Sequence, residues 1–340
     1  MHEVHQFVRV YGREEGLRRA IEGGCDPKLL EVAQRLYGDE EISLGVLFAG
    51  WCILNLPHRQ LARAEMSWRR EIRRNDFLCQ LVVEPGELQV GKQTRLYGVP
   101  FGSTARIIML FLQSEALRNN SREVELGRSL GAWLQRLDIP HGGKSYRLVR
   151  EQLLRISACS LRFLWGGHDE SGQPLSGFKK DAIIQEGVLV LGPEDAGPQH
   201  MLWQDRIVLG ESFFRALKER PVPINLKAVR AIMHSSRATD IYVWLSYRCY
   251  RLERPIKIGW LALKEQFGDP QHRLDRFRDR FIDALKLALT AYPECQVTID
   301  TKKGLTILPS PPAVPERRFL QLVPPKPPAA TSLPLLDQPG

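Results

Sequence analysis

Residues 142–163 read GGKSYRLVREQLLRISACSLRF and combine a basic helical segment with an extended one. At 100° per residue, the apolar side of a helix here consists of Tyr146, Val149, Leu153 and Ile156, and most of the cations gather on the other side. Arginine can bind guanine O6 and N7 through two hydrogen bonds and lysine can neutralise a phosphate, so this basic side is typical of a helix that enters the major groove of DNA. We predict five DNA-binding residues in this segment: Lys144, Ser145, Arg147, Arg150 and Arg155.

Two glycines precede this helix. Gly142 and Gly143 let the backbone approach a ligand closely, and the free amides at a helix N-terminus can bind a phosphate oxygen. The letters GGKS also match the end of a nucleotide-binding loop, but that pattern needs a glycine where Asp138 stands and a strand where a helix is expected. We therefore reject an ATPase. A basic helix that only faces water stays open as an alternative, although the strand and basic loop that follow favour groove entry.

A second basic helix is expected in DPQHRLDRFRDRFIDALKLALTAY, residues 269–292. Its inner stripe consists of Leu274, Phe277, Phe281 and Leu285. Its predicted DNA-binding residues are Arg273, Arg276 and Arg280, with His272 beside them. The neighbouring acids Asp279 and Asp283 either space the arginines through i,i+3 and i,i+4 pairs or make a soluble surface. DNA contact and a solvated face therefore stay equally open for this helix taken alone.

Two further segments carry lysines suited to phosphate contact. Residues 166–180, GGHDESGQPLSGFKK, read as a Gly-rich polar loop that ends in Lys179 and Lys180. Residues 295–309, CQVTIDTKKGLTILP, read as a two-stranded wing with Lys302 and Lys303 at its tip. The apolar residues of this wing alternate, as one buried face of a hairpin should. The four lysines join the predicted DNA-binding residues.

Enzyme chemistry finds little support in the sequence. The eight histidines form no HxH, HExxH or His-carboxylate spacing suited to a metal, and no nucleophile lies in a recognisable elbow or beside a base. The six cysteines stand singly, without a CxxC pair, and are expected to be reduced core residues of a cytosolic protein. We predict a non-catalytic protein with no metal and no cofactor.

Composition limits the class of protein further. With 340 residues, 43% of them hydrophobic, the chain is long enough for two ordinary domains. The excess of 48 Lys and Arg over 39 Asp and Glu favours a polyanionic partner without establishing one. The most apolar stretch, LGVLFAGWCILNLP at 44–57, is too short to cross a bilayer and is expected to be a buried helix, so we predict no membrane contact.

The order of the expected elements indicates the architecture. Residues 1–95 read as a helical extension that includes a basic, solvated helix near 58–75. Residues 96–208 then give helix, short strand, helix, turn, basic helix, strand, basic loop and strand, which is the order of a winged helix-turn-helix. Residues 209–308 repeat this order, with IKIGWLALKEQFG as the first helix of the turn. Residues 309–340 are Pro-rich and are expected to be disordered.

The predicted fold class is therefore α+β and mainly helical. It consists of two tandem winged helix-turn-helix domains, a helical N-terminal extension and a disordered Pro-rich C-terminal tail. Double-stranded DNA is the partner that two such domains with basic helices would take.

A set of ordered motifs resembles a known family. GVPFG at 98–102, SREVELG at 121–127, AWL at 132–134 and GGKSY at 142–146 follow one another as in the RepA-type plasmid replication initiators. Supporting matches are NLPHR upstream and DIYVWLSYR, IGWLALKEQFG and FRDRFIDAL downstream. The resemblance extends over roughly residues 45–308, and many ordered matches are far more specific than a single motif.

The resemblance implies a protein that recognises direct repeats, called iterons, at a plasmid origin and helps to open adjacent A+T-rich DNA. Its implied partners are origin DNA, the host replication initiator, the replicative helicase and, as a self-dimer, a second copy of the chain. Similar initiators repress their own promoter as dimers, which links initiation to plasmid copy control. The implied location is the bacterial cytoplasm, in association with the plasmid.

Three other functions stay open at this point. A transcriptional repressor would use the same two domains on an inverted repeat, with no direct replication role. An enzyme acting on DNA ends or nicks would need the metal cluster that the histidine spacing does not supply. In the third alternative, the basic helices are only a solvated surface.

Overall fold

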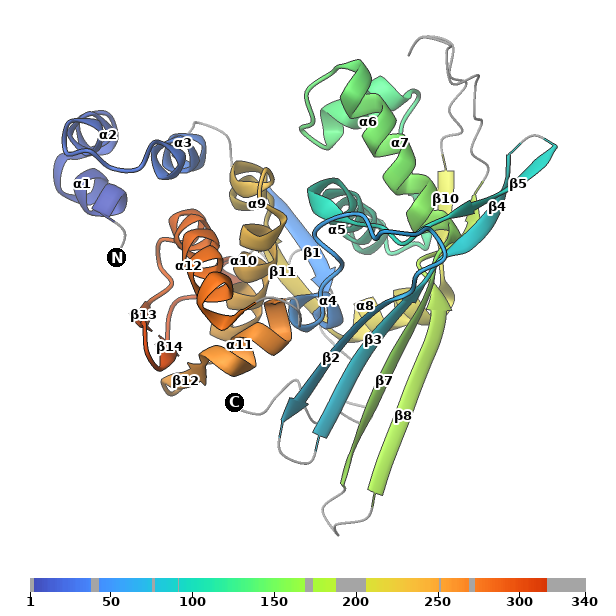
Figure 1. Ribbon diagram of the computed structural model, residues 1–340. Helices are drawn as coiled ribbons and strands as arrows, with labels where there is room; N and C mark the ends of the chain where they lie inside the picture. Colours follow the sequence, from blue (N-terminus) through green and yellow to red (C-terminus); the bar gives the residue numbers. More distant parts are fainter. Residues whose placement is uncertain are drawn as a thin grey trace. The chain divides into compact units, whose positions relative to one another are not determined.

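The computed structural model describes residues 3–37, 43–74, 77–90, 92–168, 174–187, 206–250, 252–268 and 273–316 (Figure 1). The fold is a mixed α+β fold, and in the residues just named fourteen strands form small sheets between helices. Its contacts divide the chain into two compact units. One contains the N-terminal segment up to Gly45, Ala49–Ile53 and the chain from Val222 onward, and the other contains Val46–Phe48 and Leu54–Pro221.

The unit that contains Leu54–Pro221 includes a module of three helices and a three-stranded sheet. The order along the chain is α5 (Gly102–Arg118), β6 (Glu123–Glu125), α6 (Leu130–Arg136), α7 (Gly143–Ala158), β9 (Ile184–Gly187) and β10 (Arg206–Leu209). The last strand, β10, is central: Ile207 lies opposite Val124 on one side and Gly187 on the other, both antiparallel. Helices α5 and α6 both pack on α7, and Trp133 of α6 is fully buried. The three helices and the short strand β6 agree with the prediction for 96–208, whereas the strand predicted directly after the basic helix forms but joins a different sheet from that of this module.

A four-stranded sheet in the same unit corrects two predictions. Its strands, in the order of pairing, are β2 (Trp68–Arg74), β3 (Phe77–Glu84), β7 (Ser160–His168) and β8 (Pro174–Ala182). The basic helix predicted near 58–75 is wrong, because Arg70 and Ile72 are buried while Arg69 and Arg73 are exposed, which is the alternation of a strand. Lys179 and Lys180 do not end a loop either. They lie within β8, opposite Phe163 and Arg162.

Shorter elements occur elsewhere in the first 220 residues of the chain. A β-hairpin precedes α5, and a helix that packs on α5 follows β10. The predicted buried helix over 44–57 is instead a strand followed by one helical turn, both mostly buried. These elements are β4 (Gly86–Val90), β5 (Gln93–Tyr97), α8 (Glu211–Glu219), β1 (Leu44–Phe48) and α4 (Ala49–Ile53).

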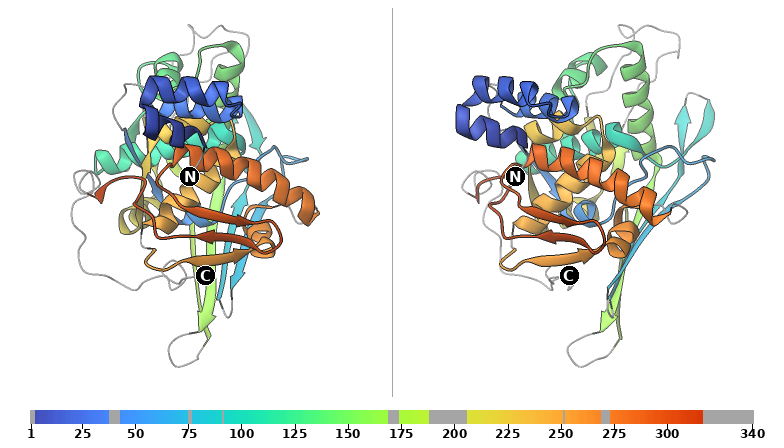
Figure 2. Two further views of the ribbon diagram at one scale, coloured as in Figure 1. Left: turned by 90° about the vertical axis from the view of Figure 1, so that its left-hand side faces the viewer. Right: turned by 60° about the vertical axis from the view of Figure 1, so that its left-hand side comes forward.

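The other unit contains a second module with the same order of elements. It runs through α10 (Ser236–Cys249), β12 (Ile256–Gly259), α11 (Trp260–Phe267), α12 (Leu274–Ala291), β13 (Val297–Asp300) and β14 (Gly304–Ile307), preceded by β11 (Pro221–Asn225) and α9 (Leu226–Ile232). The last strand is again central, since β14 pairs antiparallel with both β12 and β13. Figure 2 shows this sheet beside α11 and α12. The prediction missed strand β12, which it had read as the start of a helix.

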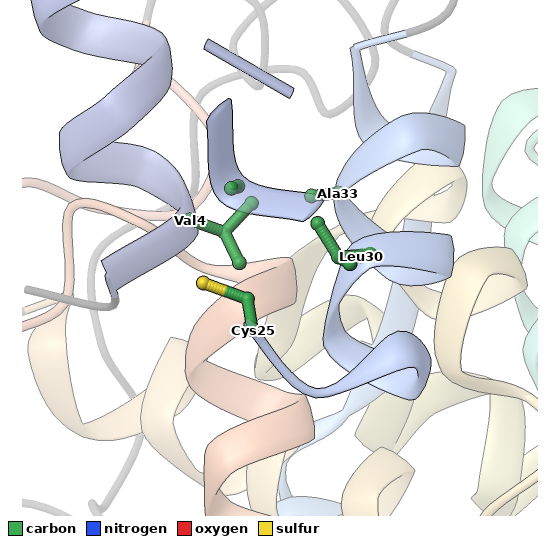
Figure 3. Close-up of a cluster of buried hydrophobic side chains, with 5 residues drawn as sticks. Val4, Cys25, Leu30 and Ala33 are labelled. Carbon is green, nitrogen blue, oxygen red and sulfur yellow. The ribbon is translucent and has the colours of Figure 1, made fainter. Parts of the chain in front are cut away.

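The N-terminal helices belong to the unit of the second module. Helices α1 (Glu3–Tyr11), α2 (Arg13–Glu22) and α3 (Pro27–Leu36) enclose a cluster formed by Val4, Ala20, Cys25, Leu30 and Ala33 (Figure 3). Helix α3 packs on α9 and α12, and a ring nitrogen of His5 lies 2.8 Å from the carbonyl oxygen of Thr290 in α12. The prediction of one helical extension over 1–95 is therefore wrong, because its start joins one unit and its strands join the other.

A glycine beside the tip of the hairpin β13–β14 allows a close approach of two strands. Gly304 has φ +140°, and a Cβ atom at this position would lie 2.0 Å from the carbonyl oxygen of Ile258. Replacement of Gly304 by alanine should lower the free energy of unfolding by about 2–4 kcal/mol, because both the strained φ and the clash must be accommodated. Urea denaturation followed by circular dichroism measures this loss. The matched control is Gly143→Ala, whose Cβ atom meets open space. Equal stability of the two variants would contradict the expectation.

Candidate nucleic-acid interface

Helix α7 turns a basic surface outward because its apolar side is held in the core. Val149, Leu153 and Ile156 are each at most 1% exposed and Tyr146 is half-buried, which confirms the predicted inner face for three of its four residues. Lys144 and Arg147, in the first turns of the helix, are exposed. Burial of each of the three apolar side chains stabilises this rotation of the helix by about 1.5–3 kcal/mol. The two cations therefore project from the module in a fixed direction.

The remaining predicted residues of this segment are placed differently. Ser145 and Arg150 are half-buried, and Arg150 has an interaction partner within the chain. The side chains of Lys179 and Lys180 lie outside the described residues. The structure therefore brings together Lys144, Ser145 and Arg147 at the N-terminal half of α7.

The two glycines before α7 have no steric role within the chain. A Cβ atom at Gly142 or Gly143 would meet nothing within 4 Å, and Gly142, with φ 166°, is extended. No capping side chain binds the first backbone N–H groups of the helix. The turn that leads into the helix is supported by a contact between the hydroxyl of Tyr146 and Nδ1 of His141, 3.2 Å apart. The open space beside the two glycines and the uncapped N–H groups suit the approach of an anionic DNA backbone.

Arg155 is not part of this exposed surface, contrary to the prediction. It is only 7% exposed, and its guanidinium donates two hydrogen bonds to Glu151, at 3.0 and 2.7 Å. A third bond of 3.1 Å goes to the carbonyl oxygen of Val99, and the group also lies over the ring of Phe101. The helical wheel placed Arg155 with Arg147, but the chain segment before α5 covers this end of α7. Arg155 therefore stabilises the module.

Helix α12 carries the corresponding cations of the second module. Phe277, Phe281 and Leu285 are buried as predicted, whereas Leu274 is 38% exposed and does not belong to the inner stripe. Arg276 and Arg280 are exposed and one helical turn apart, so they lie on one face. Within the described residues their guanidinium groups form no ion pair. The predicted neighbour His272 lies outside the described residues.

The acidic residues Asp275 and Asp279 of α12 have different partners. Asp275 accepts the backbone N–H of Arg276 at 2.8 Å and a side-chain bond from Arg273 at 2.9 Å. The backbone hydrogen bond, followed by the bond from Arg273, lowers the pKa of this carboxyl below its ordinary value. Asp279 pairs loosely with Arg278, at 3.6 Å. Arg273 is therefore held along the start of the helix, while the stripe of Arg276 and Arg280 stays available.

The hairpin β13–β14 is braced against both helices of the turn. Arg278 donates to the carbonyl oxygen of Thr301 at 3.0 Å, and the indole N–H of Trp260 donates to the carbonyl oxygen of Asp300 at 3.0 Å. The carboxylate of Asp300 accepts the backbone N–H groups of Lys303 and Lys302, which lowers its pKa. These bonds fix the tip, so the exposed lysines 302 and 303 keep one place relative to α12.

Sequence reasoning missed the two bracing residues, Arg278 and Trp260. The only sequence signal for Arg278 was its position on a different face of the helix from Arg276 and Arg280. Trp260 was read as an ordinary apolar residue of a helix.

The described residues lack two other kinds of site. They contain no group of three or more His, Cys, Asp or Glu side chains that could hold a metal ion. No helix among them combines the length and hydropathy that a membrane span requires.

Comparison with known proteins supports one class. Residues 99–260 match the family model described as plasmid encoded RepA protein. The class indicated by this match is the plasmid replication initiators. The RepA-type resemblance of the motifs is thereby confirmed over the whole first module and the second as far as Trp260.

The other comparisons add no argument about function. No curated protein matches the chain. A crystal structure of domains 2 and 3 of RctB has a TM-score of 0.48 at 9% identity, and covers 79% of this chain and 99% of that one. A second structure of RctB domains 2-3 has a TM-score of 0.43 at 11% identity, and covers 77% and 95%. Similarities at this level carry no inference.

The placement of Arg155 leads to a stability prediction. Arg155→Ala should lower the free energy of unfolding by about 2 kcal/mol, because it leaves the buried carbonyl of Val99 without its donor and removes the packing on Phe101. Arg147→Ala, the matched control on the same helix, should change stability by less than about 0.5 kcal/mol. Urea denaturation of both variants decides the matter. A larger loss for Arg147→Ala would mean that the two roles are reversed.

Proposed function

We propose that this chain is a plasmid replication initiator whose two modules are winged helix-turn-helix domains that bind iteron-type direct repeats at the plasmid origin. The observation that carries the proposal is the repeated topology. In each module a long helix exposes cations from its N-terminal half and a three-stranded sheet has its last strand in the centre. The match of residues 99–260 to the RepA family supports the same conclusion.

In the first module, α7 enters the major groove. Arg147 reads a base edge, because an exposed guanidinium can bind guanine O6 and N7 together. Lys144 binds phosphate. Gly142 and Gly143 let the DNA backbone approach the uncapped amides, and Ser145 lies in the same turn.

In the second module, α12 carries base or near-base contacts and the hairpin carries phosphate contacts. Arg276 and Arg280 face the groove, with Arg273 along the edge. The wing lysines 302 and 303 reach phosphates beside it, in the way that a fixed wing flanks a helix in the groove.

Two modules on one chain can occupy successive major grooves, about 34 Å or one helical turn apart. A direct repeat of roughly 20 base pairs is therefore the natural target. The phosphate contacts determine register and most of the salt-dependent affinity, and the arginines determine sequence preference.

The further steps follow from the family resemblance. Several bound protomers bend the duplex and store deformation beside weak A+T steps, which promotes opening. The chain then recruits the host initiator and helicase, acts without catalysis or cofactor in the bacterial cytoplasm, and represses its own promoter as a dimer, which regulates copy number.

The experiment that tests the proposal is a footprint on DNA flanking the gene of this protein, at two salt concentrations. We expect evenly spaced protection over direct repeats, lost in the Lys144→Ala/Arg147→Ala variant. Exposed Arg215, which pairs with Glu211 outside both basic helices, provides the control variant Arg215→Ala. Protection of a single inverted repeat at the promoter would instead indicate a transcriptional repressor. No protection at all would indicate that the basic helices are only a solvated surface.

The wing makes a separate prediction about salt dependence. Lys302→Ala/Lys303→Ala should weaken binding to all DNA sequences alike and reduce the slope of log K against log[salt] by about 1 to 2, since two phosphate contacts are lost. Fluorescence anisotropy with specific and random duplexes between 50 and 200 mM salt measures both quantities. An unchanged slope would show that the wing does not touch phosphate.

A further inference from the structure

Two buried cysteines of the second module lie in contact with each other and have no part in the interface described above. The Sγ atom of Cys249, the last residue of α10, lies 3.5 Å from the Sγ atom of Cys295, in the turn between α12 and β13. One thiol donates a hydrogen bond to the other. The two residues are 46 positions apart, so the fold and not the local sequence brings them together.

The chain around Cys295 is fixed from two sides. The backbone N–H of Leu308 donates to the carbonyl oxygen of Gln296 at 2.9 Å, and the N–H of Gln296 donates to the hydroxyl of Ser310 at 2.9 Å. The hydroxyl of Tyr292 donates to the carbonyl oxygen of Pro311. Cys249 and Cys295 are 3% and 7% exposed. The two sulfur atoms are therefore held in contact and not only near one another.

The two thiols also differ chemically from the other buried cysteines. Burial raises the pKa of Cys159 to about 12, which keeps that thiol protonated and inert. At Cys249 the hydrogen bond with Cys295 lowers the pKa, and the hydroxyls of Tyr292 and Ser310 act in the same direction, against the effect of burial. The same shared hydrogen bond raises the pKa of Cys295. Cys249 is thus the thiol that ionises first, with a second thiol beside it.

We propose that Cys249 and Cys295 form a reversible disulfide when the chain meets a hydroperoxide, and that this bond joins the end of α10 to the turn after α12. The thiolate of Cys249 attacks one peroxide oxygen, the O–O bond breaks, and an alcohol or water leaves, which makes a sulfenic acid. The thiol of Cys295 then attacks this sulfur, the S–S bond forms and water leaves. Two thiols lose two electrons in total, and one hydroperoxide is reduced.

The expected consequence is a stabilised second module. A cross-link between residues 46 positions apart restricts the unfolded chain strongly and stabilises the folded one. The pair lies beyond the C-terminal end of α12, an 18-residue helix about 27 Å long, whereas the exposed cations lie in its N-terminal half. The inference rests on the cysteine pair alone, so it stands or fails independently of the proposed function.

The test uses the full chain, reduced, freed of reductant and treated with hydrogen peroxide. Remaining thiols are blocked with N-ethylmaleimide, and tryptic peptides are analysed by mass spectrometry without reduction. We expect residues 249–251 linked to residues 287–302, with loss of two hydrogens, and release of the link by dithiothreitol. The apparent Tm of the oxidised chain should exceed that of the reduced chain by about 5 °C or more.

Two variants separate this bond from other oxidation. Cys249→Ser should lose both the link and the shift in Tm on oxidation, whereas Cys79→Ser, a half-buried cysteine elsewhere, should keep both. The wild-type chain decides the question even if a variant folds poorly. Recovery of Cys249 and Cys295 as maleimide adducts after peroxide treatment, or a link from either of them to Cys79, would overturn the proposal.

Discussion

The structure depends on one constraint that both long helices share: a buried apolar stripe determines which way each helix faces. In α7 this stripe contains Val149 and Leu153, and in α12 it contains Phe277 and Phe281, all at most 5% exposed. Turning either helix about its axis would expose several such side chains, at about 1.5–3 kcal/mol each. The cations on the opposite side therefore need no further device to point outward.

Much of this arrangement could be predicted from the sequence, because it depends on local periodicity. The extents of α5, α6, α7 and α12 and the wing β13–β14 follow from apolar spacing and turn residues. The strand at Trp68–Arg74 was missed, since its dense arginines look helical, although Arg70 and Ile72 are buried on one face and the segment pairs with the strand Phe77–Glu84 directly after it. The sheet is completed by a non-local pairing, in which Leu81 lies opposite Phe163, and a pairing of that kind leaves no signal in one segment. The burial of Arg155 could not be predicted for the same reason, because its partner Val99 lies 56 residues away.

The candidate interface divides in the same way. Exposure of Lys144, Arg147, Arg276 and Arg280 follows from helical periodicity, so the sequence was sufficient to find them. The braces that hold the wing, from Arg278 and Trp260, depend on how the hairpin folds back on α11 and α12 and could not be read from spacing. The contacts that hold a site in place are thus harder to predict from a sequence than the exposed side chains of the site.

The central claim is that both modules of one chain read DNA. Hydroxyl-radical footprinting on a duplex with a single repeat tests it directly, when the wild-type chain is compared with Lys144→Ala/Arg147→Ala and with Arg276→Ala/Arg280→Ala. The account predicts two protected segments about one helical turn apart, of which each variant loses a different one. Loss of one segment in the first variant and no change in the second would contradict it and leave DNA recognition to the first module alone.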